Sequence, residues 1–332
     1  MYNIKGQKAE KVDSTTLSVL GYQESDLEEI IRTNINMLCD EEESLLIVGQ
    51  QVHDEQHRRS DLTAVDSNGN IVLIEIKRDR KDIEHRKEAF EFQAIRYAAS
   101  YATIESPEEL VNKVYVPYIE KHRNEFVLSE LTSYELGIRK LNEFLIENES
   151  EKNFNEKQRI ILVASEYDDQ TLSAVAWLNS NNVGISCFEM IPMKIQGEIF
   201  FDVVKILPIP KHGDYYVNVM DKNILPRRTV INSPRRNLPK INDMIEWGVI
   251  KPGDVIIPKG RDGEGILQKN GKVMVNNKEM SLQKWLQEVF GWSHVQTYGF
   301  SIHKESGRSL RELRREYMEK AAIEAIDGEK DL

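Results

Sequence analysis

Two carboxylates and a lysine stand in a short apolar stretch of the sequence. Asp61 leads one β-prone run, and Glu75 and Lys77 end the next run, which begins Ile71-Val72-Leu73-Ile74. Polar groups set in apolar strands must be hydrogen-bonded, paired or bound to metal, because burying them unpaired costs several kcal/mol. Two carboxylates and an ammonium group converging there predict a divalent-metal site suited to phosphodiester hydrolysis. The alternative is an ordinary amphipathic hairpin with a surface salt bridge.

The turn between these runs decides whether the two carboxylates can meet. Residues 66–70 read Asp-Ser-Asn-Gly-Asn, a turn signal between two β-prone runs. A two-residue Asn-Gly loop would put the carboxylates on opposite faces, whereas a three-residue loop ending at a left-handed Gly69 places Asp61 directly opposite Glu75. Glu75 and Lys77 already share a face by the period of two, and a slip of one residue would separate the carboxylates. We therefore predict the three-residue loop, a type I turn followed by a glycine bulge.

A glutamine and a tyrosine follow on a predicted helix over residues 87–99. Gln93 and Tyr97 are four positions apart, so they lie on one helix face. Phe90, Ala94 and Tyr97 form an apolar stripe beside Gln93. Alone this pair is a weak signal, since a tyrosine on a buried stripe is usually part of the core.

The order Asp, Glu-x-Lys, Gln-x-x-x-Tyr resembles the PD-(D/E)xK nuclease superfamily, above all its RecB-like and NucS-like endonucleases. The resemblance covers roughly residues 22–210 and implies an α/β fold, a mixed central sheet flanked by helices as in restriction endonucleases. It also implies an acidic residue from a helix ahead of the hairpin, for which Glu28 is the candidate and Glu24 the second choice. Alternatively Glu28 only caps that helix, because Ser25 with Glu28 three residues on forms a capping box. Ser60 stands where the family often has a small or apolar residue, a mild departure.

The cofactor implied is Mg²⁺, for which Mn²⁺ can substitute, because hard oxygen ligands suit these ions. Asp61, Glu75 and the carbonyl of Ile76 would hold the ion, with Glu28 reaching the same site. The ion would activate a water and stabilise transition-state charge. Lys77 would orient that water and neutralise charge.

The partner implied is DNA, and the expected activity is endonucleolytic cleavage in restriction of, or defence against, foreign or modified DNA. Gln93 would position the lysine, the water or the cut strand, and Tyr97 would brace the helix or contact a phosphate. A structure-specific repair nuclease, a non-cleaving DNA-binding protein with this fold and an RNA nuclease stay open as alternatives. A homodimer is compatible with the resemblance, since one such site cuts one strand.

The net charge of −11 argues mildly against nucleic-acid binding, because DNA affinity depends largely on phosphate neutralisation. Local basic clusters oppose this argument, although charge runs are usually solvated faces. Four arginines, Arg308, Arg311, Arg314 and Arg315, crowd a predicted C-terminal helix. The residues proposed to contact DNA are Arg78, Lys81, Arg227, Arg228, Arg235 and Arg236.

A chain of 332 residues suggests about two domains. Strand and helix patterns predict strands near residues 159–165, 183–190 and 199–206, with a helix over 168–178 that makes a right-handed crossover. The expected parts are an N-terminal arm (1–21), the nuclease domain (22–212) with a helical insertion (about 107–154), a basic proline-containing linker (213–240), a small β-rich α+β domain (241–320) and a tail (321–332).

The predicted second domain resembles the RAMA domain, a module associated with restriction enzymes and DNA adenine methylases. The matching features are Gly291-Trp292 and the ending Leu310-Arg311-Glu312-Leu313-Arg314, preceded by a hairpin signal at Asn270-Gly271 and a helix capped by Ser281. The resemblance implies a module that reads DNA or senses its modification. The alternative is a packing or dimerisation domain, and Trp285 and Trp292 are expected in the core of the domain.

Other features narrow the class of protein. Cys39 and Cys187 are too few and too far apart for a disulfide framework or zinc knuckle. The segment from Gly49 to His57 holds two histidines but is expected to be a loop ahead of the Asp61 strand. No signal-peptide pattern and no apolar run near the ~20 residues of a membrane span are present, so a cytoplasmic protein without membrane contact is expected.

Overall fold

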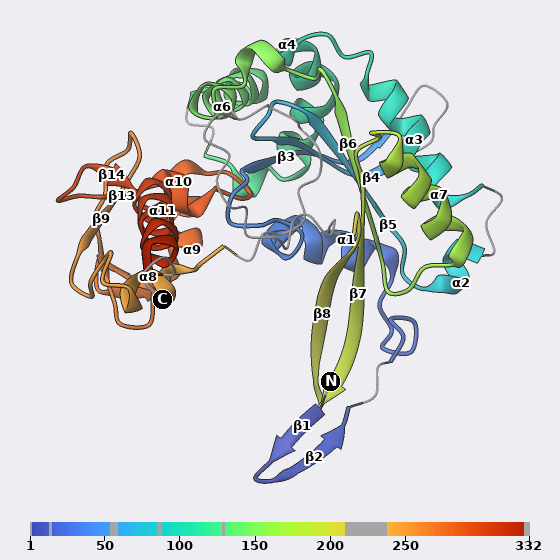
Figure 1. Ribbon diagram of the computed structural model, residues 1–332. Coiled ribbons are helices and arrows are strands. Elements are labelled where there is room, and N and C mark those ends of the chain that lie inside the picture. The colour runs from blue at the N-terminus through green and yellow to red at the C-terminus, as the bar shows by residue number, and fades with distance from the viewer. Residues whose placement is uncertain are drawn as a thin grey trace. The chain divides into compact units, whose positions relative to one another are not determined.

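The computed structural model describes residues 2–12, 15–53, 59–84, 88–127, 130–209 and 238–328. The chain folds into two compact units (Figure 1). The N-terminal unit comprises Met1–Leu38 and Leu46–Pro234, and the C-terminal unit comprises Cys39–Leu45 and Arg235–Leu332. The second unit therefore includes a short segment from the first third of the chain, which the sequence assigned to the nuclease domain.

A six-stranded mixed sheet forms the centre of the N-terminal unit, in the order β3-β4-β5-β6-β7-β8. Strands β4 and β5 pair antiparallel, β5, β6 and β7 are parallel, and β7 and β8 are antiparallel. The strands are β3 (Leu45–His53), β4 (Arg59–Asp66), β5 (Ile71–Ile76), β6 (Gln158–Ala164), β7 (Ile185–Ile195) and β8 (Glu198–Leu207). The predicted α/β class is confirmed, with helices packed on this sheet.

Strand β3 corrects one expectation, since the segment from Gly49 to His53 is strand rather than loop. The apolar run Leu45–Val48 is buried and starts the strand. Gln50 and Gln51 continue the strand, and their side-chain amides form hydrogen bonds with His122 and Glu28, respectively.

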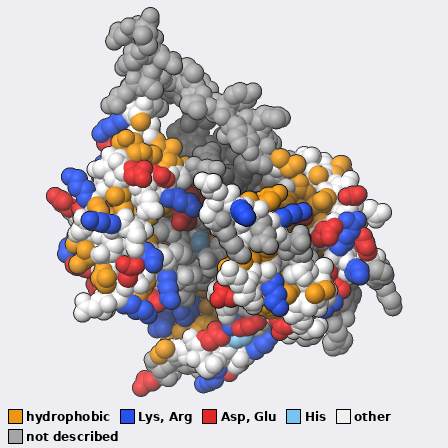
Figure 2. All heavy atoms as spheres, turned by 90° about the horizontal axis from the view of Figure 1, so that it is seen from below, with side chains coloured by type: hydrophobic (Ala, Val, Ile, Leu, Met, Phe, Trp, Pro, Cys, Tyr) orange, Lys and Arg blue, Asp and Glu red, His pale blue; other side chains and the backbone are white. Residues whose placement is uncertain are grey.

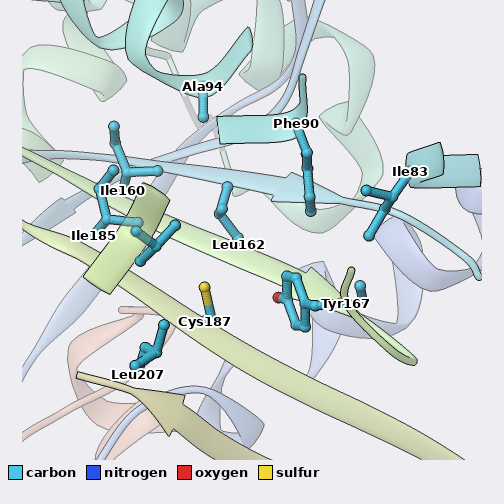
Figure 3. Packing of buried hydrophobic residues seen from close by; sticks show 11 residues of the cluster. Ile83, Phe90, Ala94, Ile160, Leu162, Tyr167, Ile185, Cys187 and Leu207 are labelled. Carbon is cyan, nitrogen blue, oxygen red and sulfur yellow. The ribbon is translucent and has the colours of Figure 1, made fainter. Parts of the chain in front are cut away.

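Helices α3 (Phe90–Tyr101) and α7 (Asp169–Ser180) pack with the sheet around one buried cluster. Figure 3 shows Phe90 and Ala94 of α3 facing Leu162 of β6, with Cys187 of β7 in the same cluster. The β6–α7–β7 connection joins two parallel strands, as predicted. Helices α1 (Glu24–Thr33) and α2 (Arg80–Glu84) belong to the same unit, and α1 lies against β4 and β5.

The predicted helical insertion is present between α3 and β6. It contains a π-helical turn, η2, directly between α4 and α5. Its elements are α4 (Pro107–Leu110), η2 (Val111–Tyr115), α5 (Val116–Lys121), η3 (Arg123–Glu125), α6 (Ser133–Glu147) and η4 (Glu151–Asn153). Thr132 caps α6 in a capping box with Glu135.

The N-terminal arm holds a hairpin of β1 (Tyr2–Lys5) and β2 (Lys8–Lys11), which the sequence had left without structure. Figure 1 shows β7 and β8 extending from the sheet as a long ribbon with this hairpin near its tip. The amide of Thr15 donates to the carbonyl of Pro192 at 3.1 Å, which ties the arm to β7.

The C-terminal unit is built on an antiparallel sheet in the order β12-β11-β10-β9-β13-β14. The hairpin predicted at Asn270-Gly271 joins β10 to β11, and Ser281 accepts a hydrogen bond from the Lys284 amide at the start of α9, as predicted. Its elements are α8 (Ile241–Glu246), β9 (Val255–Pro258), β10 (Gly265–Leu267), β11 (Val273–Val275), β12 (Lys278–Met280), α9 (Leu282–Phe290), α10 (Thr297–Phe300), β13 (Ser301–His303), β14 (Arg308–Ser309) and α11 (Leu310–Gly328).

Trp285 and Trp292 are buried in this second unit, which confirms that they are core residues. Helix α11 runs to Gly328, so the predicted tail from residue 321 continues a helix for eight residues. None of the helices in the described part of the chain is long and apolar enough to cross a membrane.

Candidate active site

The register of β4 and β5 brings the two predicted carboxylates together. Leu62 pairs with Ile74, and the register continues unbroken to Val65 and Ile71. One residue further along the same register, Asp61 stands opposite Glu75. The sequence prediction of this register is confirmed.

The turn that sets the register is the predicted three-residue loop. The amide of Gly69 donates to the carbonyl of Asp66 at 2.9 Å, and the amide of Asp66 donates to the carbonyl of Asn70 at 3.0 Å. Gly69 has φ +82°, the left-handed conformation that glycine adopts most easily. The Asp66 carboxylate accepts from the amides of Asn68 and Asn70, so this third buried acid holds the turn.

Lys77 lies beside these carboxylates with only 4% of its surface exposed. Its Nζ donates to Oε2 of Glu24 at 3.0 Å and to the carbonyl of Ile76 at 2.7 Å. Oδ2 of Asp61 accepts from the amide of Ile76 at 2.8 Å. Asp61, Ile76 and Lys77 therefore meet at one point, together with Glu24, the second choice of the sequence analysis.

Glu75 is fully buried, and Nε2 of Gln93 donates to its Oε2 at 3.3 Å. Its Oε1 is also buried and accepts no hydrogen bond in the described structure. Burial, and then the charge of Asp61, raise the pKa of Glu75 well above its usual value. Burial likewise raises the pKa of Asp61. Tyr97 is buried on the same helix as Gln93, which fits the bracing role expected of it.

The helix before the hairpin begins earlier than predicted. Its N-cap is Gln23, whose amide donates to Oδ2 of Asp26 at 2.7 Å, so the capping box predicted for Ser25 and Glu28 is wrong. Because the helix starts at Glu24, Asp26 is its third residue, and its side chain accepts from the backbone amide of the N-cap residue Gln23. Glu28 is thereby released from a capping role.

Glu28 is 2% exposed and turned inward. Nε2 of Gln51 donates to its Oε2 at 3.1 Å, while its buried Oε1 has no partner in the described structure. Burial raises the pKa of Glu28, and the nearby charge of Asp61 adds to this. Gln51 was not predicted from the sequence, although two consecutive glutamines shortly after the apolar run Leu45–Val48 were a usable signal.

The residues fit a divalent cation by donor type. Two unpartnered buried carboxylate oxygens, on Glu75 and Glu28, lie near Asp61 in a site where like charges repel. Among the described residues no three His, Cys, Asp and Glu side chains form a ready metal cluster. Mg²⁺ commonly binds one or two protein carboxylates and completes its coordination shell with water and phosphate oxygens. Asp61 and Glu75 together would supply the carboxylate ligands that such an ion requires.

The basic residues proposed to contact DNA have different placements. Nε of Arg78 lies 3.2 Å from Oδ2 of Asp82, and its Nη1 donates to the carbonyl of Tyr22 at 3.4 Å, so it is engaged within the fold. Lys81 is exposed on α2. The remaining four, Arg227, Arg228, Arg235 and Arg236, lie outside the described residues.

Two of the C-terminal arginines also have internal partners. Arg314 is 3% exposed, pairs with Glu42 and donates to the carbonyl of Pro239 at 3.1 Å. Arg311 pairs with the same Glu42 at 3.0 Å. On the face drawn in Figure 2, Lys and Arg side chains lie interspersed with Asp and Glu. Nucleic-acid binding on that face would therefore depend on individual basic side chains and not on one continuous basic surface.

Comparison with known protein families, with curated proteins and with solved structures finds no match to this chain.

Proposed function

We propose that the protein is a metal-dependent DNA endonuclease of the PD-(D/E)xK type, acting in restriction of, or defence against, foreign or modified DNA. The observation that carries the proposal is the opposition of Asp61 and Glu75 in a buried hairpin, with Lys77 at the same point. A surface salt bridge, the alternative explanation of this motif, would leave these groups exposed, whereas all three are at most 8% exposed.

Mg²⁺ or Mn²⁺ would be held by Asp61, Glu75 and the carbonyl of Ile76, with Glu28 as a further ligand. When bound, the ion supplies Lewis-acid activation of water for attack on phosphorus. Lys77 places a positive charge where negative charge develops on the phosphate, and its ammonium orients the attacking water.

The neighbouring side chains keep this arrangement in place. Gln93 fixes one oxygen of Glu75, and the other, buried and without a hydrogen bond in the described structure, would bind the cation. Glu24 forms an ion pair with Lys77 at 3.0 Å, which fixes the position of the lysine side chain. Tyr97, buried four positions along the same helix, would brace the helix that carries Gln93.

The C-terminal unit is proposed to select the DNA, as its likeness to RAMA domains implies. Because Trp285 and Trp292 are buried, the selecting surface uses other groups. A homodimer would let two sites cut both strands of a duplex.

The deciding experiment is cleavage of methylated and unmethylated plasmid with Mg²⁺ or Mn²⁺, comparing wild type, Lys77→Ala and the exposed-lysine control Lys152→Ala. We expect metal-dependent cutting that falls by about 10²–10³ in Lys77→Ala, as for other transition-state charge stabilisers, and is unchanged in the control. The same assay includes flap, mismatch and RNA substrates. Preferential cutting of flaps or mismatches would indicate a repair nuclease in place of a restriction enzyme, and preferential cutting of RNA would indicate an RNA nuclease. Intact DNA binding without cutting of any substrate would support a non-cleaving binding protein.

A further inference from the structure

A hollow of about 400 Å³ opens between β3 and the helical insertion of the N-terminal unit. Gln50, Gln51 and Val52 of β3 form one wall, and Lys113 and Lys121 stand on the other. This volume falls within the range of small-ligand sites, roughly 300–1,000 Å³.

Both walls of the hollow have irregular backbone. Gln51 has φ +57° within a strand, a conformation that a residue with a side chain rarely adopts. The opposite wall includes the π-helical turn Val111–Tyr115, which carries Lys113. A Cβ on Gly49 would lie 2.6 Å from Cγ1 of Val114, so the strand packs closely on that turn. Strained residues and π-helical turns are both frequent at functional sites.

The polar groups at the floor are held in fixed positions. Nε2 of His122 lies 2.7 Å from Oε1 of Gln50, and Nε2 of Gln51 donates to Glu28 at 3.1 Å. Nη1 of Arg32 donates to the hydroxyl of Tyr118, another lining residue, at 3.0 Å. Nε2 of Gln50 also donates to Oε2 of Glu29 at 3.4 Å, so Gln50 only shapes the wall, whereas the Gln51 amide, held by Glu28 at its nitrogen, can offer its oxygen to a polar ligand.

The two lysines give the hollow its charge. The nearby acids Glu29 and Glu125 are both paired with Arg32. Lys113 pairs with Glu109 at 2.6 Å but is 62% exposed. Such an exposed ion pair contributes little to stability. Lys113 can therefore leave Glu109 and bind a phosphate instead.

We infer that this hollow binds one nucleotide of the nucleic acid, next to the carboxylate site. Lys113 and Lys121 contact the phosphate, Oε1 of Gln51 accepts from the base edge, and Val52 packs on the sugar or base. The inference rests on the proposed function, because Gln51 both lines the hollow and holds Glu28 of the candidate site.

The test is fluorescence-anisotropy binding of a labelled single-stranded oligothymidylate in the presence of a chelator, so that no cleavage occurs. The double variant Lys113→Ala/Lys121→Ala is compared with Lys152→Ala/Lys157→Ala, which removes the same charge from exposed positions elsewhere. We expect binding at least about fivefold weaker and a salt slope smaller by about 1.4, the loss of two single-strand phosphate contacts. The control pair keeps both values, and Lys113→Arg/Lys121→Arg restores them.

Equal affinity and salt slope in the two alanine pairs would overturn the inference without touching the nuclease proposal. If wild type never cuts nucleic acid but the Lys113→Ala/Lys121→Ala protein alone loses binding, the nucleotide site stands and the nuclease proposal fails. Binding of thymidine monophosphate without binding of the oligonucleotide would overturn the assignment to a nucleic-acid strand. Thermal unfolding of each variant checks that the comparison is between folded proteins.

Discussion

Asp61 stands directly opposite Glu75 on the antiparallel strands β4 and β5, and both carboxylates are buried. The backbone amide of Ile76 donates to Oδ2 of Asp61 at 2.8 Å, and the backbone amide of Asp61 faces the Glu75 carboxylate. Two carboxylates so placed repel each other when ionised, and a cation between them would remove the repulsion. The pair is therefore a source of instability in the metal-free protein and of affinity for a cation.

Replacing Glu75 with Gln is expected to stabilise the metal-free protein at alkaline pH. Burial and Asp61 raise the pKa of Glu75 above the ordinary 4.5, so the folded state binds more protons than the unfolded state. The free energy of unfolding of the wild type therefore falls as pH rises from 4.5 through the raised pKa. Urea unfolding should show the variant more stable by roughly 1–2 kcal/mol at pH 8, with the gap narrowing towards pH 4.

The matched control is Glu156→Gln, which removes an acid from an exposed position. It should leave the pH dependence of wild type intact. If the free energy of unfolding of Glu75→Gln equals that of wild type across the whole pH range, ionisation of Glu75 does not destabilise the folded protein.

Magnesium is expected to stabilise the wild type and not the Glu75→Gln variant. An ion that binds only the folded state adds about 2.7 kcal/mol to the free energy of unfolding at 100 times its Kd. Thermal unfolding at pH 8 with increasing Mg²⁺ should therefore raise the Tm of wild type progressively. Equal shifts in both proteins would place the ion away from this pair.

Removing the amide of Gln93 is expected to impair catalysis while leaving the fold intact. Its Nε2 holds Oε2 of Glu75 at 3.3 Å, and Gln93 is only partly buried. Loss of a group that orients a metal ligand commonly lowers metal affinity or activity by 10- to 100-fold. Cleavage rates of Gln93→Ala across a Mg²⁺ titration should show that loss, with Ser100→Ala on the exposed side of the same helix as control. Wild-type rates at every Mg²⁺ concentration would rule out this role.

The hairpin and its register were predictable because they depend on local chemistry. The period of two puts Glu75 and Lys77 on one face of β5, and only the three-residue loop brings Asp61 of β4 directly opposite Glu75. The crossover through α7 and the helical insertion were also predictable from residue patterns, whereas the mixed sheet was expected from the family resemblance.

The remaining features depend on contacts between residues distant in the sequence. Gln51 became part of the site only because α1 brings Glu28 to it, 23 positions away. The segment Cys39–Leu45 was assigned to the first domain because nothing local separates it, yet it pairs with His294 of the second unit. Arginines of α11 looked available for DNA, but Arg314 turned out to pair with Glu42.

Gly69→Ala is expected to destabilise the N-terminal unit by more than backbone strain alone. Gly69 has φ +82°, and a Cβ there would lie 2.9 Å from the carbonyl oxygen of Ser150. Gly21 has φ +83° with no atom within 4 Å of such a Cβ, so Gly21→Ala isolates the strain, about 1–2 kcal/mol. Urea unfolding should show a larger loss in the free energy of unfolding for Gly69→Ala than for Gly21→Ala. Equal losses would mean that the segment around Ser150 moves to accommodate the added Cβ without cost.

The C-terminal unit should depend strongly on Glu42, although that residue precedes most of the unit by some two hundred positions. Glu42 pairs with Arg314, whose side chain is 4% exposed, and with Arg311 at 3.0 Å. Glu42→Gln leaves a buried guanidinium without its counter-charge, and we expect a loss of about 2–4 kcal/mol. Glu316→Gln, which breaks exposed pairs on the same helix, should cost at most about 1 kcal/mol. Urea unfolding followed by fluorescence of Trp285 and its neighbours measures both, and similar small losses would mean that the unit holds together without the Cys39–Leu45 segment.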